Sequence, residues 1–176
     1  MRRSGNHSHY ENAVEAYLKE NNYPYISTLE SRRVAYNGGT IKNFDFILPG
    51  RKILFMDIKG RKFGYASTPG NTFENWILLD DISSLTTWSS LSSSNQQAYL
   101  LYAFCLPDMA MPLPKVFIGN SFVFNEKVYA FLAITIEDYI KNSKKRSIKP
   151  PACCVSRKLF ATLVTPLFQI LIENKI

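Results

Sequence analysis

The chain has 176 residues, with 21 Lys and Arg against 14 Asp and Glu, so its formal net charge is +7. Its length suits one domain, 1–176, and a hydrophobic content of 46% excludes a disordered chain. No apolar run approaches the roughly 18–20 residues of a membrane span, and no apolar stretch follows the basic N-terminus as in a secretory signal. We therefore expect a cytoplasmic protein with no membrane partner, whose positive charge favours a polyanionic one.

The first part of the chain predicts a helix followed by short strands. Apolar residues recur at i, i+3, i+4 and i+7 between residues 10 and 21, which is the period of an amphipathic helix. Ser8 is the expected N-cap of this helix, and Glu11 is its capping-box partner. Two short strands are expected near residues 25–29 and 32–36.

A β-hairpin is expected next, because 44–48 and 53–59 are rich in β-formers and flank a Pro-Gly loop. Asp45 and Asp57 interrupt these strands, and alternation puts Asp57 on the same face as Lys59. If paired residue numbers sum to 102, Asp45 lies opposite Asp57, with Cβ atoms about 4.5–5.5 Å apart. Two carboxylates that close repel unless one is protonated or a cation lies between them. The alternative is a surface hairpin end where Lys59 simply pairs with an acid.

The remaining elements alternate between strands and helices, which predicts a mixed α/β domain. They are a loop to about residue 75, a helix from Asp80 or Asp81 to Leu91, strands at 98–106, 115–118, 122–124 and 128–134, a helix over 135–145, a break at 150–151, and a helix over 156–174 interrupted near Pro166.

Glu11 on a helix, Asp45 on a strand and Asp57-Ile58-Lys59 on the next strand resemble the signature of the PD-(D/E)XK nucleases. This is the restriction-endonuclease-like superfamily, which includes Holliday junction resolvases. The segment from Glu11 to Leu18 resembles the first-helix motif of the resolvase branch. The resemblance covers about residues 8–106 and implies a restriction-endonuclease-like α-β-β-β-α-β core with a mixed central sheet. Residues 107–176 would then add C-terminal strands and helices.

The resemblance implies a metal-dependent deoxyribonuclease that uses Mg²⁺ or Mn²⁺ to hydrolyse phosphodiester bonds. Asp45 and Asp57, with the backbone carbonyl of Ile58, would bind the metal ion. Lys59 would position or activate the attacking water. Glu11 would complete a second metal site or hold a metal-bound water; its alternative role is the capping box alone.

Basic residues provide expected contacts to DNA phosphates, some near the scissile bond and some on the flanking backbone. The first group is Arg61 and Lys62, and the second is Lys141, Lys144, Lys145, Arg146 and Lys149. Two-fold pairing is common among such nucleases, so the resemblance also allows a homodimer. Two alternatives stay open: a non-catalytic DNA-binding protein on the same fold, and a metal-free interaction module whose acids are structural.

Overall fold

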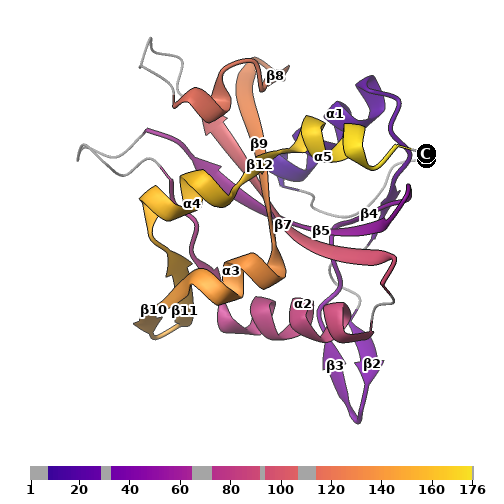
Figure 1. Ribbon diagram of the computed structural model, residues 1–176, viewed down its shortest axis with the longest axis vertical. Helices are drawn as coiled ribbons and strands as arrows, with labels where there is room; N and C mark the ends of the chain where they lie inside the picture. Colours follow the sequence, from indigo (N-terminus) through magenta and orange to yellow (C-terminus); the bar gives the residue numbers. More distant parts are fainter. Residues whose placement is uncertain (1–7, 29–32, 65–72, 92–93, 107–113, 176) are drawn as a thin grey trace.

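A computed structural model describes residues 8–28, 33–64, 73–91, 94–106 and 114–175 (Figure 1). Two ends of expected strands, Leu29 and Arg32, lie outside the described residues, as does the middle of the expected loop that follows the hairpin.

A central mixed sheet organises the chain. Its strand order is β1-β4-β5-β7-β9-β12, and β8 also pairs with β9. The pair β5–β7 is parallel, and the other described pairs in this sheet are antiparallel. The strands are β1 (Ile26–Ser27), β4 (Phe46–Leu48), β5 (Ile53–Lys62), β7 (Gln96–Leu106), β8 (Ser121–Phe124), β9 (Lys127–Thr135) and β12 (Thr165–Pro166).

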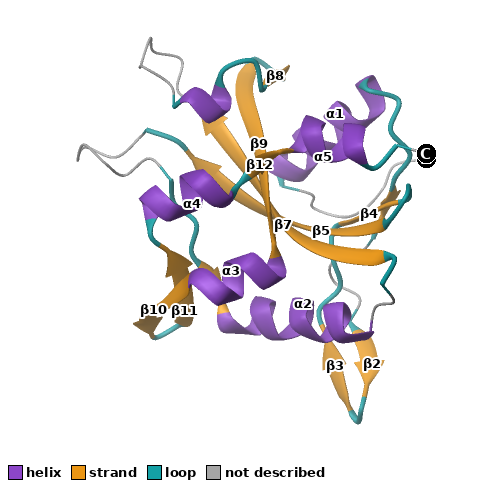
Figure 2. Cartoon of the chain, in the orientation of Figure 1, coloured by secondary structure: helices purple, strands orange, loops and turns teal. Residues whose placement is uncertain are grey.

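Helices cover both faces of this sheet (Figure 2). One core packs α1 (His9–Glu20) and α5 (Leu167–Glu173) against the sheet through residues such as Leu18 and Leu171. The core on the other face receives α2 (Leu79–Leu91), α3 (Ile136–Asn142) and α4 (Arg157–Leu163). None of the helices among the described residues is long and apolar enough to cross a membrane.

Side-chain alternation along β5 decides which face carries the polar residues. Met56 and Ile58 belong to the core under α1 and α5, whereas Phe55 belongs to the core under α2. Asp57 and Lys59 share the parity of Phe55, so they face α2. The parallel pair β5–β7 requires a crossover, and α2 lies within that crossover.

Two smaller sheets flank the body. A hairpin of β2 (Val34–Tyr36) and β3 (Gly39–Ile41) turns at Asn37 and Gly38, whose φ angles are 47° and 75°. Figure 1 shows this hairpin projecting from the body beside α2. The second small sheet has the order β10-β11-β6, with β10 (Ser143–Ile148), β11 (Pro151–Val155) and β6 (Ile77–Leu78).

The structure confirms the expected hairpin and its register. Phe46 pairs with Met56 and Leu48 with Leu54, so paired numbers sum to 102. The first helix is confirmed with Ser8 as N-cap.

One expected element is wrong, and another is confirmed over only part of its length. Lys115–Phe117 forms a short 3-10 helix (η1), not a strand. The helix expected over 135–145 ends at Asn142, because Ser143 takes extended angles and the chain continues as β10. The final helix is split as expected near Pro166, into α4 and α5.

Candidate active site

A buried carboxylate and a buried ammonium lie between β5 and α2. Asp57 is 2% exposed and Lys59 is 9% exposed. Lys59 Nζ is 2.6 Å from Asp57 Oδ2 and donates a 2.8 Å hydrogen bond to Oδ2 of Asp81. Asp81 belongs to the first turn of α2. Helix α2, which lies in the crossover between β5 and β7, therefore supplies the second carboxylate that contacts Lys59.

A second lysine closes these contacts into a ring. Lys42, just after β3, donates from Nζ to Asp81 Oδ1 at 3.2 Å and lies 3.8 Å from Asp57 Oδ1. We call Asp57, Lys59, Asp81 and Lys42 the four-charge ring. It contains two positive and two negative groups, so its formal charge is zero. Sequence reasoning assigned Asp81 only to the start of a helix and did not identify Lys42.

Asp45 lies beside the ring at the end of the β4–β5 ladder. Its backbone N–H donates to Met56 O at 3.0 Å, and its Oδ2 accepts a 2.6 Å hydrogen bond from Ile58 N–H. Residues two apart in a strand point their backbone N–H and C=O groups toward the same neighbouring strand, so those of Met56 and Ile58 both point toward the β4 side of β5. The Ile58 carbonyl therefore faces the edge where Asp45 lies. The structure thus brings together Asp45, Asp57, Lys59 and the backbone of Ile58.

The electrostatics of the ring follow from its burial and its opposite charges. Burial raises the pKa of Asp57, although the ammonium groups of Lys59 and Lys42 oppose that change. Burial alone would lower the pKa of Lys59, but Asp57 and Asp81 outweigh it and raise that pKa. For Asp81, burial is again outweighed, and Lys59 and Lys42 hold its pKa below the usual range. Within the described structure, Asp57 Oδ2 has no hydrogen-bond donor aligned with it, although Lys59 Nζ is in ion-pair contact.

The structure places Glu11 apart from this group. Ser8 Oγ donates to Glu11 Oε1 at 3.1 Å, and Glu11 N–H donates back to Ser8 Oγ at 3.4 Å. Helix α1 packs on the opposite face of the sheet from Asp57. Across the described residues, no three or more His, Cys, Asp or Glu side chains group closely enough to hold a metal ion together. Glu11 therefore makes the expected capping contact, and its part in a second metal site stays a prediction.

Arg61 continues the row of side chains on this face of β5. Its guanidinium donates to the carbonyls of Gly60 and Trp76, and it lies 4.8 Å from the centre of the Trp76 ring. Arg146 on β10 lies 5.4 Å from the centre of the same ring. Trp76 therefore links the strand that carries Lys59 to the basic hairpin β10–β11.

The other basic residues expected to contact phosphates lie at the surface. Arg146 is 3.8 Å from Glu74, and its side chain is 44% exposed. The exposed basic residues on β5, α3, β10 and the β10–β11 turn are Lys62, Lys141, Lys144, Lys145, Arg146 and Lys149.

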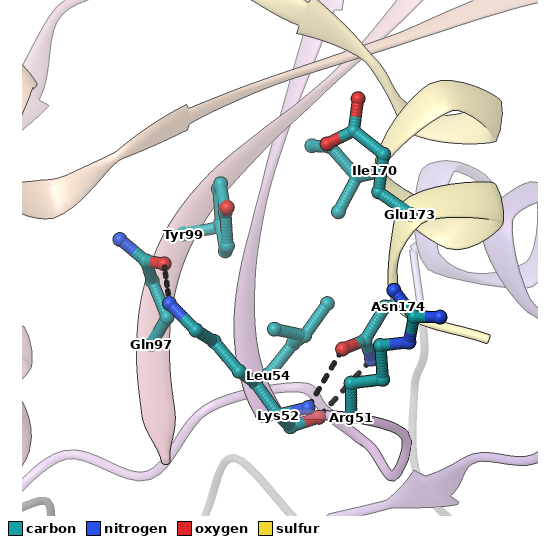
Figure 3. Close-up of a pocket in the computed structure, with 8 residues that line it drawn as sticks. All are labelled: Arg51, Lys52, Leu54, Gln97, Tyr99, Ile170, Glu173 and Asn174. Atoms are coloured by element: carbon teal, nitrogen blue, oxygen red, sulfur yellow. Dashed lines mark hydrogen bonds between the residues drawn. The ribbon is translucent and has the colours of Figure 1, made fainter. Parts of the chain in front are cut away.

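A separate cavity of about 240 Å³ lies toward the start of β5, on the α5 side (Figure 3). Asn174 closes it: Oδ1 accepts from Lys52 N–H at 2.8 Å, and Nδ2 donates to Lys52 O and Tyr23 Oη, each at 3.1 Å. No member of the four-charge ring lines this cavity. Its lining residues are Arg51, Lys52, Leu54, Gln97, Tyr99, Ile170, Glu173 and Asn174.

Comparison with known proteins identifies the fold. No family model matches the sequence, and no curated protein matches it. Among solved structures, Hjc, a Holliday junction resolvase from the archaeon Archaeoglobus fulgidus, aligns with a TM-score of 0.52 at 13% identity. The alignment covers 93% of this chain and 98% of that one. The chain therefore has a restriction-endonuclease-like fold similar to that of this resolvase. This resolvase-like fold extends beyond the expected core of residues 8–106 into the C-terminal region.

Proposed function

We propose that this chain is a Mg²⁺- or Mn²⁺-dependent nuclease that hydrolyses phosphodiester bonds in DNA. The observations that support the proposal are the hydrogen bond from Ile58 N–H, next to Asp57, to Asp45, and the contact of Lys59 with Asp57. They involve three of the four residues that the PD-(D/E)XK resemblance assigns to catalysis, on a fold similar to that of a Holliday junction resolvase.

The residues at this position fit a hard divalent cation. Mg²⁺ commonly uses one or two carboxylates and fills its remaining positions with other oxygens. Asp45 and Asp57 supply two carboxylates, and the Ile58 carbonyl supplies a neutral oxygen at the same edge. A bound ion would contribute Lewis-acid stabilisation of the phosphate and a more acidic water. Glu11 as part of a second metal site stays a prediction, separate from these ligands.

Lys59 supplies the positive charge that chemistry at a phosphate requires. Its ammonium is held between two carboxylates, so its position is fixed before substrate arrives. A fixed ammonium can orient the attacking water and stabilise negative charge that develops on the phosphate oxygens. Asp57 and Asp81 thus act on the reaction partly by holding Lys59 in place.

The basic surface next to the site supports DNA as the substrate. The two Arg side chains stacked on Trp76 join β5 to β10, and exposed lysines continue along β10. Cations in such a row suit the phosphates of one strand, which repeat along the nucleic acid. We assign Arg61 to holding Trp76 and Arg146 in place, and the exposed residues of β10 to contacting phosphates. The assembly as a homodimer stays a prediction.

Cleavage of a substrate panel tests the proposal. Labelled linear duplex, single strand, flap, four-way junction and supercoiled plasmid are incubated with Mg²⁺, Mn²⁺ or chelator. Wild type should cut at least one substrate only with metal, and Lys59→Ala and Asp57→Asn should abolish cutting while retaining DNA binding. Lys19→Met is a matched control, since the Lys19 side chain is 62% exposed and belongs to α1, on the opposite face of the sheet from Lys59. Cutting that survives chelation, or equal cutting by Asp57→Asn, would refute the assignment.

A non-catalytic DNA-binding protein on the same fold is the second candidate. The observation that favours it is the ammonium of Lys42, which lies 3.8 Å from Asp57 Oδ1 and already supplies positive charge beside that carboxylate. The panel separates the two candidates, because this alternative predicts salt-sensitive binding without cutting. Glu11→Gln should lower the rate if Glu11 completes a second metal site, and should change only helix stability if it caps α1.

A further inference from the structure

Both carboxylate oxygens of Asp57 face an ammonium group. Oδ2 is 2.6 Å from Lys59 Nζ, and Oδ1 is 3.8 Å from Lys42 Nζ. Asp57 is 2% exposed, so protein groups rather than solvent surround its carboxylate. A further cation that binds Asp57 must therefore share an oxygen that already faces a lysine.

Helix α2 holds Lys42 at this place. Lys42 N–H donates to Ser84 Oγ at 3.2 Å, and Lys42 C=O accepts from Trp88 Nε1 at 2.9 Å. Asp81, Ser84 and Trp88 are spaced three and four residues apart, so they lie on one face of α2. Lys42 also has a further interaction besides these, so the protein itself engages this residue. Lys42 is therefore a built-in counter-cation for the acids beside β5.

The two lysines differ in how firmly they are held beside Asp57. The Lys59 side chain is 10% exposed and lies 2.6 Å from Asp57, whereas the Lys42 side chain is 20% exposed and lies 3.8 Å away. The backbone of Lys42 is bound to α2, but the four-carbon stem of a lysine is flexible. The ammonium can therefore move away from Asp57 while the backbone keeps its hydrogen bonds. A competing cation would displace Lys42 before it displaces Lys59.

A divalent cation and the Lys42 ammonium oppose each other at Asp57. Like charges a few ångströms apart repel, and the repulsion is stronger in a buried site than in water. With Lys42 in place the four-charge ring is formally neutral, so it has no surplus negative charge to attract a metal ion. Without the Lys42 ammonium the other three members carry a formal charge of −1, and Asp45 provides another carboxylate beside them. The lysine that balances these acids thus also weakens their affinity for a metal ion.

We propose that Lys42 sets the metal affinity of the site, because its ammonium competes with a divalent cation for Asp57 Oδ1. This inference rests on the proposed function for the metal ligands. It assigns the control of metal binding to a residue just after β3, a part of the chain that the nuclease signature does not include.

Binding of Mn²⁺ in the absence of DNA tests this competition. Free Mn²⁺ is followed by electron paramagnetic resonance during titration of wild type, Lys42→Met, Lys42→Gln and Lys42→Arg. The first two variants should bind Mn²⁺ at least about 10-fold more tightly than wild type, because each removes a positive charge near the ion. Lys42→Arg keeps that charge and should show no such gain. Adding Asp57→Asn to Lys42→Met should remove the gain.

A matched control separates a local effect from a change in net charge. Lys19→Met removes the same formal charge from α1, on the opposite face of the sheet, and should bind Mn²⁺ as wild type does. Thermal unfolding confirms that each variant is folded. Lys42→Gln keeps a polar side chain that can still donate to Asp81, so it decides the test if Lys42→Met is too unstable to titrate.

The outcomes distinguish this inference from the nuclease proposal. Equal or weaker Mn²⁺ binding by the folded Lys42→Met and Lys42→Gln variants would overturn the inference, as would a gain that Asp57→Asn leaves in place. If the gain is found but wild type cuts no substrate of the panel, the competition is supported and the nuclease proposal fails. If wild type cuts with metal and the gain is absent, the nuclease proposal survives and the competition is refuted.

Discussion

Replacing Asp81 by Asn should expose the interdependence of the four-charge ring. The substitution keeps the size of the side chain but removes one of two negative charges, so the ring acquires a formal charge of +1. Removing one partner of a buried ion pair typically costs about 3–5 kcal/mol. Lys59 and Lys42 both retain Asp57, and the Asp81 side chain is 12% exposed. We therefore expect a smaller loss, about 2 kcal/mol in the free energy of unfolding, which lowers Tm by roughly 4–8 °C.

A double-mutant cycle makes this prediction specific. Lys42→Met alone should cost about 1 kcal/mol, because it leaves the ring with a charge of −1. Combined with Asp81→Asn, it restores a formal charge of zero through the remaining pair of Asp57 and Lys59. The double variant should therefore lose less stability than the sum of the single losses, by at least about 1 kcal/mol.

Urea unfolding followed by circular dichroism is the appropriate assay, because guanidinium is a salt and would screen the ion pairs. Asp80→Asn is the matched control. Asp80 precedes Asp81 on the same helix, but its side chain is 66% exposed, and it lies 3.6 Å from the exposed Arg33. An exposed pair contributes about 0–1 kcal/mol. Equal stabilities of Asp80→Asn and Asp81→Asn, or additive losses in the cycle, would show that the ring is not a coupled unit.

Three further predictions concern stability. Asn174→Ala removes three side-chain hydrogen bonds, two of them to the Lys52 backbone, and should cost roughly 2–4 kcal/mol in urea unfolding. A loss below about 0.5 kcal/mol would mean that these bonds do not hold the C-terminal helix. Gly60→Ala should lower Tm because the new Cβ would collide with the Tyr10 ring, and Tyr10→Ala should relieve that effect in the double variant. Burial raises the pKa of Tyr129 to about 12, so its phenol keeps its proton in the folded state while the unfolded phenol loses it near pH 10. Stability should therefore fall between about pH 10 and 12, less so in Tyr129→Phe.

The parts of the fold that sequence reasoning predicted correctly depend on neighbours along the chain. The helix capped by Ser8 and the hairpin around Pro49-Gly50 follow from local periodicity and turn chemistry, and the loop length fixes the register. Asp57 stood out for the same reason, because a carboxylate in an apolar strand requires a partner.

The remaining part of the site comes from contacts across the fold. Asp81 reaches Lys59 only because the parallel pair β5–β7 places α2 over one face of the sheet. Lys42 lies near Asp57 because Ser84 and Trp88 of that helix hold the Lys42 backbone through hydrogen bonds. No local pattern marks either residue, so sequence reasoning identified the strand acids and missed their partners.

The end of the helix expected over 135–145 could not be located from the sequence. Lys144 and Lys145 are both exposed, so neither a helical nor a strand period is visible in their sequence. Backbone pairing with Cys154 and Cys153 decides the conformation instead.

The short pairing of β6 with β11 has a consequence for how the chain can diversify. Ile77 pairs with Cys153, and β6 leads directly into the helix that carries Asp81. All four charges of the ring come from residues 42–81, whereas the exposed cations of β10 come from the last third of the chain. If the proposed function holds, replacing the exposed cations of β10 should alter substrate preference and leave the four-charge ring intact, provided that the β6–β11 pairing is kept. The two-residue strand β6 is thus the connection that would have to be kept while the four-charge ring and the basic residues of β10 changed independently.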